Sequence, residues 1–114
     1  MMIIRQGDVL IRRTRKKTPS AQAKRVTDQG RTILAYGEVT GHAHEVITEA
    51  PAADDRVPAQ QLFEEPDGTR LLVVQGPATF VRHEEHSKLH IPAGTYEIII
   101  QREYTPQGLR NVTD

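Results

Sequence analysis

The hydrophobic residues of this chain fall into short runs that glycine, proline and polar residues separate. Strand-like runs cover residues 8–13, 31–39, 42–47, 60–65, 69–74, 78–82 and 95–104. No stretch longer than about ten residues shows the 3.6-residue period of an amphipathic helix. Because the connections are short, neighbouring strands are expected to pair antiparallel. The pattern therefore predicts an all-β fold, a small antiparallel β-barrel or sandwich of about seven or eight short strands.

Turn signals divide these runs. The sequence Pro-Asp-Gly at 66–68 predicts a hairpin turn. Residues 50–58, which include two prolines, predict an exposed and mobile loop. The last strong run, 95–104, predicts one strand with Tyr96 and Ile98 on a shared face. The chain thus divides into strands and connections without an internal repeat.

Length and composition bound the class of protein. The chain has 114 residues, which suits one compact domain over residues 1–114. It contains no cysteine, so nitrogen and oxygen would have to hold any metal ion. No apolar run approaches the roughly 20 residues that span a bilayer, and the first residues lack the layout of a secretory signal. We therefore expect a cytoplasmic protein without a membrane partner.

The formal net charge is zero, but the N-terminal third is basic. Residues 1–31 contain nine Lys or Arg against two acids. Such a segment attracts phosphates, so nucleic acid is a candidate partner, and a solvated strand face is the alternative. The candidate nucleic-acid-binding residues are Arg12, Arg13, Arg15, Lys16, Lys17, Lys24 and Arg25. Aromatic residues are scarce, which argues against a stacking platform for single-stranded bases.

All five histidines lie in two short segments. His42 and His44 would project from one face of a strand, because alternate residues of a strand point the same way. Imidazole binds transition metals and moves protons near neutral pH. A His-x-His pair supplies two ligands, and a neighbouring strand could supply a third. We therefore predict that both segments meet at one pocket that binds Zn, Fe, Ni or Mn, with ligands drawn from His42, His44, His83, His86 and His90.

The spacing within residues 83–90 permits more than one arrangement. On a helix, His83, His86 and His90 would share a face, whereas on a continuous strand His83 and His86 point to opposite sides. The segment follows a strand and ends at a Pro-Ala-Gly sequence. This favours a strand, a turn around Glu85 to Lys88, and a second strand. His83 and His86 would then both line the rim of a pocket.

Carboxylates accompany the histidines. The nearby glutamates are Glu38, Glu45, Glu84 and Glu85. Each could bind a metal, act as a general base or orient a ligand. The candidate catalytic residues are therefore these four glutamates together with His42, His44, His83 and His86.

Three functions fit these residues. The first is a divalent-metal enzyme of hydrolytic or lyase type. The second is a metal-independent ribonuclease, in which one histidine removes the proton of a ribose 2′-hydroxyl, another protonates the leaving oxygen, and the basic N-terminal segment holds the RNA. The third is a non-catalytic binding module. The substrate is accordingly a small molecule or RNA, and a homodimer is left open.

Two resemblances add to these expectations. The sequences Gly-Glu-Val-Thr-Gly-His-Ala-His at 37–44 and Ile-Pro-Ala-Gly at 91–94 resemble parts of the cupin motifs. This resemblance implies a small β-barrel that holds a divalent metal in its mouth, with His42 and His44 as paired ligands. Tyr96 stands where that family would place a further histidine.

A wider pattern is similar to a group of small uncharacterised bacterial proteins. It comprises residues 6–10, 37–44, 83–86 and 101–104. This resemblance implies a single compact domain.

Overall fold

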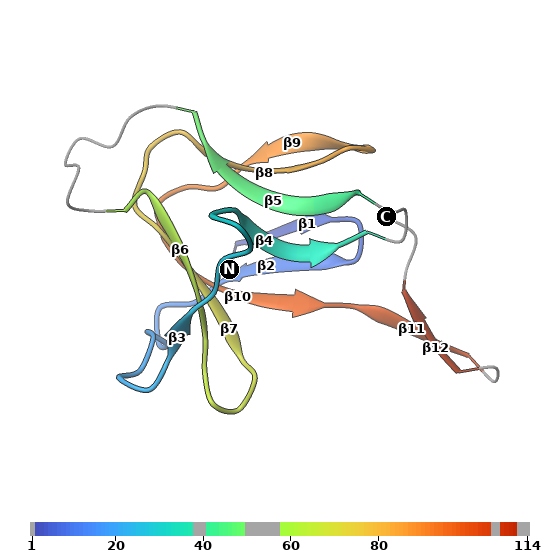
Figure 1. The fold of residues 1–114 in the computed structure, drawn as a ribbon, viewed down its shortest axis with the longest axis horizontal. Coiled ribbons are helices and arrows are strands. Elements are labelled where there is room, and N and C mark those ends of the chain that lie inside the picture. The colour runs from blue at the N-terminus through green and yellow to red at the C-terminus, as the bar shows by residue number, and fades with distance from the viewer. Residues whose placement is uncertain (1, 38–40, 50–57, 106–107, 112–114) are drawn as a thin grey trace.

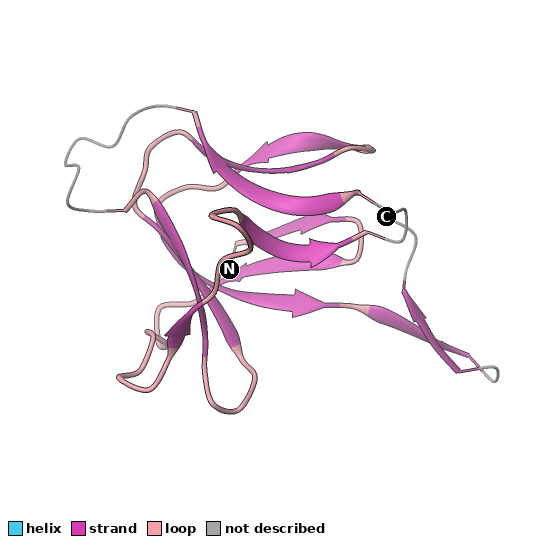
Figure 2. Cartoon of the chain, in the orientation of Figure 1, coloured by secondary structure: helices cyan, strands magenta, loops and turns pink. Residues whose placement is uncertain are grey.

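The computed structural model describes residues 2–37, 41–49, 58–105 and 108–111, and the side chains among them up to Gln101. Twelve strands lie within these ranges (Figures 1 and 2). They are β1 (Ile3–Gln6), β2 (Val9–Arg13), β3 (Lys24–Arg25), β4 (Thr32–Tyr36), β5 (Ala43–Thr48), β6 (Gln60–Glu64), β7 (Arg70–Val74), β8 (Thr79–His83), β9 (His86–His90), β10 (Gly94–Ile100), β11 (Arg102–Thr105) and β12 (Gly108–Asn111). Over the described residues, the structure contains no helix long and apolar enough to cross a membrane.

Ten of these strands form two antiparallel sheets. The larger sheet has the order β1-β2-β10-β7-β6-β3, and the smaller has the order β4-β5-β8-β9. β11 and β12 pair with each other and lie beyond the end of β10 (Figure 1). The predicted all-β, antiparallel fold is confirmed. Its form is a sandwich, and within the described residues neither sheet closes into a barrel.

The structure has more strands than the hydrophobic runs predicted. β3 has only two residues and both are basic, so it gives no hydrophobic pattern. The run 95–104, predicted as one strand, is divided between β10 and β11. The break falls at Gln101, whose backbone N–H donates to the Asp8 carbonyl at 2.7 Å. Most of the predicted loop at 50–58 lies outside the described residues.

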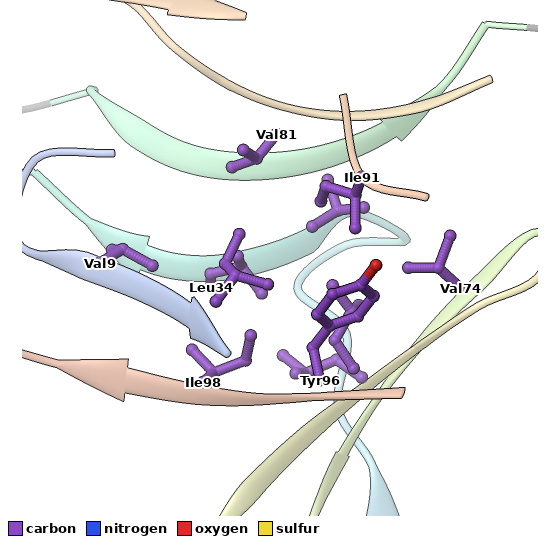
Figure 3. Packing of buried hydrophobic residues seen from close by; sticks show 11 residues of the cluster. Val9, Leu34, Val74, Val81, Ile91, Tyr96 and Ile98 are labelled. Carbon is purple, nitrogen blue, oxygen red and sulfur yellow. The ribbon is translucent and has the colours of Figure 1, made fainter. Parts of the chain in front are cut away.

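The hydrophobic core lies between the two sheets (Figure 3). Val46 of β5 and Val81 of β8 are direct partners and are both buried. They belong to one cluster with Val9, Tyr96 and Ile98 of the larger sheet. Burial of each large apolar side chain contributes roughly 1.5–3 kcal/mol. This layer therefore determines which face of each strand points inward.

Two hairpin turns can be compared with the positions that the sequence predicted. The turn predicted at 66–68 joins β6 to β7, and Gly68 there has φ +89°, a left-handed conformation that suits glycine. The turn predicted around Glu85 to Lys88 lies instead at Glu84 and Glu85, and β9 already begins at His86. The expected order of strand, turn and strand is confirmed, but the second strand begins earlier.

Candidate metal centre

The apolar inner face of β5 and β8 ends in histidine. Val46 lies opposite Val81. His44 lies two residues before Val46 and His83 lies two residues after Val81, so both histidines share the inner face with the two valines. Both histidines are buried, and their ring centroids are 4.3 Å apart with an angle of 28° between the planes. Strand pairing thus brings the two histidine segments together, as the sequence predicted.

A β-bulge in β9 decides which histidine of the second segment joins the cluster. His83 pairs with His86, whereas Val81 pairs with Leu89, so β9 holds one extra residue between these pairs. In a regular strand, His86 and His90 would share a face. The bulge places His86 on the inner side with Leu89, and its ring lies 4.9 Å from that of His83.

His90 lies outside the cluster. Its side chain is exposed on the outer side of β9, where the ring meets that of Phe80 at a centroid distance of 5.4 Å. Its Nε2 lies within hydrogen-bonding distance of the Pro77 carbonyl, at 3.2 Å. The structure therefore brings together His42, His44, His83 and His86, and leaves out His90.

His42 and two carboxylates border the outer side of the cluster. The ring of His42 lies 5.6 Å from that of His83 at an interplanar angle of 88°, and its Nδ1 lies 3.8 Å from Glu85 Oε2. Glu84 Oε1 accepts a hydrogen bond from the Ala43 backbone N–H at 2.9 Å. This hydrogen bond is the main reason that the pKa of Glu84 lies below its usual value. Glu84 is therefore an oriented carboxylate anion at neutral pH.

His42, His83 and Glu84 form the tightest group of donors. One ligand atom from each lies within 4.8 Å of the other two. A metal ion lies in the plane of an imidazole that binds it. Because the rings of His42 and His83 are nearly perpendicular, their planes intersect, and one ion can lie in both planes. We call this group the outer triad.

The larger sheet contributes two further side chains that the sequence analysis did not select. Gln6 Oε1 lies 3.0 Å from His44 Nδ1, and Asp8 Oδ1 lies 3.6 Å from His44 Nε2. Both residues flank the β1–β2 turn and are buried. A signal was present in the sequence, because Gln6 and Asp8 are polar residues at the junction between two strands. Strand pattern alone does not show that this turn faces the histidines of the other sheet.

Glu45 lies on the opposite face from His44. Its carboxylate accepts hydrogen bonds from Arg31 Nη2 at 3.0 Å and from Arg82 Nη2 at 2.9 Å. The bond from Arg31 is the first cause that lowers the pKa of Glu45. The prediction that Glu45 acts with the histidines is therefore not supported by its position: this buried residue belongs to an ion-pair cluster on the opposite face of β5. Glu38 lies outside the described residues.

Arg12 and Arg13 lie at the other end of β2 from the histidines. β2 runs from Val9, beside Asp8, to Arg13, and at about 3.3 Å per residue this places Arg13 roughly 16 Å from Asp8. Arg12 and Lys17 both form ion pairs with Glu97. The other predicted nucleic-acid-binding residues are partly or fully exposed: Arg13, Arg15, Lys16, Lys24 and Arg25.

Tyr96 occupies the core instead of a metal site. It is fully buried, and its hydroxyl donates to the Pro92 carbonyl at 2.6 Å. Burial raises the pKa of this hydroxyl above its usual value. The position where the cupin resemblance would place a histidine therefore stabilises the sandwich.

Comparison with known proteins identifies the family of this chain. No curated protein matches the chain, and no solved structure matches it. A family profile described as "Domain of unknown function (DUF8820)" matches residues 5–101, which include every histidine and both sheets except the first two residues of β1. The chain therefore belongs to this family, DUF8820.

Proposed function

We propose that this protein is a divalent-metal enzyme, and that the outer triad of His42, His83 and Glu84 binds the metal. The observation behind the proposal is that ligand atoms of these three residues lie within 4.8 Å of one another. An ion about 2.1 Å from each ligand holds tetrahedral donors roughly 3.4 Å apart. Small side-chain rotations would therefore close the triad around one ion.

Buried nitrogen atoms support the same proposal. Within the described part of the chain, His42 Nδ1 and His86 Nε2 are buried and make no hydrogen bond. A buried polar atom without a hydrogen bond costs free energy, and an ion is one of the recognised explanations. Coordination would remove that cost at the nitrogen that binds the ion.

The charge around the cluster favours a cation over a phosphate. Within the part of the chain that the structure describes, two carboxylates pair with histidines of the cluster, Asp8 with His44 and Glu85 with His42. Arg82 follows Val81 in β8, but its guanidinium binds Glu45 on the opposite face. Carboxylates repel a scissile phosphate and attract a metal ion. This difference favours the metal enzyme over the metal-independent ribonuclease.

The residues also fit Lewis-acid chemistry. A bound divalent ion would polarise a substrate or lower the pKa of a water molecule. Glu85 is half-exposed and lies next to His42, so it is placed to move a proton between substrate and solvent. The proposed reaction class is hydrolysis or elimination on a small molecule. The absence of cysteine fits a cytoplasmic enzyme, which is the location we propose.

Metal content tests this proposal. Protein purified without a histidine tag should contain near-stoichiometric Zn, Fe, Ni or Mn by elemental analysis. His42→Ala and Glu84→Gln should each weaken Zn²⁺ binding at least tenfold in calorimetric titration, because each removes a ligand of the triad. His90→Ala is the matched control, since it removes an imidazole outside the cluster and should leave the affinity unchanged.

Activity on RNA provides the opposing result. RNA cleavage that survives a chelator and leaves a cyclic phosphate end would overturn the metal proposal in favour of the ribonuclease. Absence of both metal and cleavage would leave the binding module.

A further inference from the structure

We infer that a second binding site, for the phosphate group of a small phosphorylated molecule, lies at the end of β2 that is remote from the histidine cluster. The site goes beyond the proposed metal function and does not depend on it. At about 3.3 Å per residue of β2, Arg13 lies roughly 16 Å from Asp8, so the two sites are separate. A pocket of about 620 Å³ lies at this end, and its described lining residues are Met2, Arg13, Thr14, Arg15 and Lys16.

The lining of this pocket is positively charged. It holds Arg13, Arg15 and Lys16, and no acid is found among its described lining residues. The next residue, Lys17, pairs with Glu97. By contrast, the part of the chain that the structure describes provides no carboxylate that forms an ion pair with the three cations of the pocket. Three such cations around one pocket attract an anion that carries more than one charge.

The backbone of a neighbouring segment holds Arg13 in place. A Cβ atom at Gly94, the first residue of β10, would lie 3.1 Å from Arg13 Nε and 3.3 Å from Nη2, so the absence of a side chain at Gly94 makes room for the guanidinium. Arg13 Nη2 also donates to the Ala93 carbonyl at 3.4 Å. A guanidinium has five N–H donors, so most of them remain for a ligand. A side chain that is positioned before binding loses less conformational entropy when the ligand binds.

The donors favour a phosphate monoester over a carboxylate. A phosphate monoester carries about −1.5 to −2 charge at pH 7 and has three acceptor oxygens, whereas a carboxylate carries a single charge and has two. The planar guanidinium of Arg13 can bind two phosphate oxygens at once. Arg15 and Lys16 can then compensate the remaining charge. The volume of the pocket also lies within the roughly 300–1,000 Å³ that is usual for small-molecule sites.

The distribution of charge favours a small molecule over nucleic acid. A nucleic-acid backbone follows a continuous track of cations. Lys24 and Arg25 belong to β3, which lies four strands from β2 in the larger sheet, roughly 19 Å at the usual spacing of about 4.8 Å. β6 and β7 lie between them, and the turn that joins these two strands contains Glu65 and Asp67, which line a pocket together with Lys16. These acids interrupt the track.

Calorimetric titration with phenyl phosphate tests the site. At physiological ionic strength, wild type should bind one phenyl phosphate per chain, and high salt should weaken the binding because it screens the three cations. Benzoate has the same ring and a single charge, so it should bind at least about tenfold more weakly.

Two variants and a control locate the bound phosphate. Arg13→Gln should weaken phenyl phosphate binding at least about tenfold, because it removes charge-assisted hydrogen bonds. Arg25→Gln is the charge-matched control, since it removes an exposed arginine outside the pocket, and it should keep the affinity within about twofold because distant charges are screened. His42→Ala should also leave the affinity unchanged, because the phosphate does not bind at the proposed metal centre.

A nitrogen–proton spectrum of wild type provides a test that does not depend on the folding of a variant. Phenyl phosphate should shift the side-chain Nε–H signal of Arg13 and the amide signal of Gly94, and should leave the amide signal of Ala43 unchanged. The absence of binding, equal binding of benzoate, or binding that His42→Ala abolishes would overturn the inference. A short oligouridylate RNA that binds more tightly than phenyl phosphate, and that Arg13→Gln and Arg25→Gln weaken equally, would replace the pocket with a nucleic-acid-binding surface.

Discussion

Two polar clusters occupy opposite faces of the same pair of strands. On the outer face, Glu45 of β5 is held between Arg31 and Arg82. On the inner face, the neighbouring residues His44 and His83 are stacked. The Glu45 ion-pair cluster joins a carboxylate to two guanidinium groups, so its charges compensate one another. The inner cluster joins imidazole nitrogens to carboxylates, which are all potential ligands for a cation.

Under the proposed function, this difference separates a cluster that stabilises the fold from one that binds a metal ion. A cluster whose members satisfy one another contributes to folding and requires no ligand. Imidazole nitrogens and carboxylates that lie together can bind a proton or a metal ion. Adjacent residues in the sequence can therefore have unrelated roles, because alternate residues of a strand face different environments.

The largest expected effect is stabilisation by metal. Zn²⁺ at about 100 times its dissociation constant should stabilise the fold by about 2.7 kcal/mol, because it binds the native state alone. For a domain of this size, thermal unfolding should show a rise in Tm on the order of 10 °C over protein in chelator. Glu45→Gln should show the same rise. An equal rise in the double variant His42→Ala, Glu84→Gln, which removes two of the three proposed ligands, would contradict the proposed metal site.

The next effect concerns the Glu45 ion-pair cluster. Glu45→Gln should lower the free energy of unfolding by about 1.5 kcal/mol in urea denaturation, since it weakens hydrogen bonds between charged groups. Its Zn²⁺ stoichiometry should equal that of wild type. A change in metal binding would show that the two faces are coupled.

The contribution of Glu45 should depend on pH. The arginines lower the pKa of the Glu45 carboxyl in the folded state below its ordinary value of 4.5, so the unfolded state takes up a proton first as the pH falls. The stabilisation is fully present above about pH 4.5 and is lost as the pH falls through the lower folded pKa. The difference in stability between wild type and Glu45→Gln should therefore narrow in acid. A constant difference down to pH 2 would contradict this origin.

The smallest effect is expected at His90. His90→Ala should change the free energy of unfolding by less than about 0.5 kcal/mol, because the side chain is exposed. Zn²⁺ affinity should stay within about twofold of wild type. A larger loss of affinity would place His90 in the metal centre and refute the effect assigned to the β9 bulge.

Several parts of the site could be predicted from local sequence. The His-x-His spacing placed His42 and His44 on one side of a strand. Glu45 was still predicted as a catalytic residue, although the same alternation directs it to the other side, where it binds Arg31 and Arg82. The clustering of all histidines in two segments indicated which parts of the chain would supply imidazoles to a shared cluster. These features follow from residue type and from a period of two, which any single strand imposes.

Other parts depend on contacts between distant segments. His86 joins the cluster because β9 has one extra residue opposite β8, and this bulge leaves no mark in the hydrophobic pattern. Gln6 and Asp8 join because the β1–β2 turn packs against the end of the other sheet, where Gln6 donates to the Val81 and Ser87 carbonyls.

The sequence by itself determined an all-β chain, nitrogen and oxygen as the available metal donors, and two segments that hold every histidine. Only the tertiary structure decided which donors meet. It brought Asp8 to His44, turned His86 inward and His90 outward, and separated Arg13 from the cluster. The physical reason is that alternation is a property of one strand, whereas register and sheet-to-sheet packing are set by burial of a core formed from the whole chain.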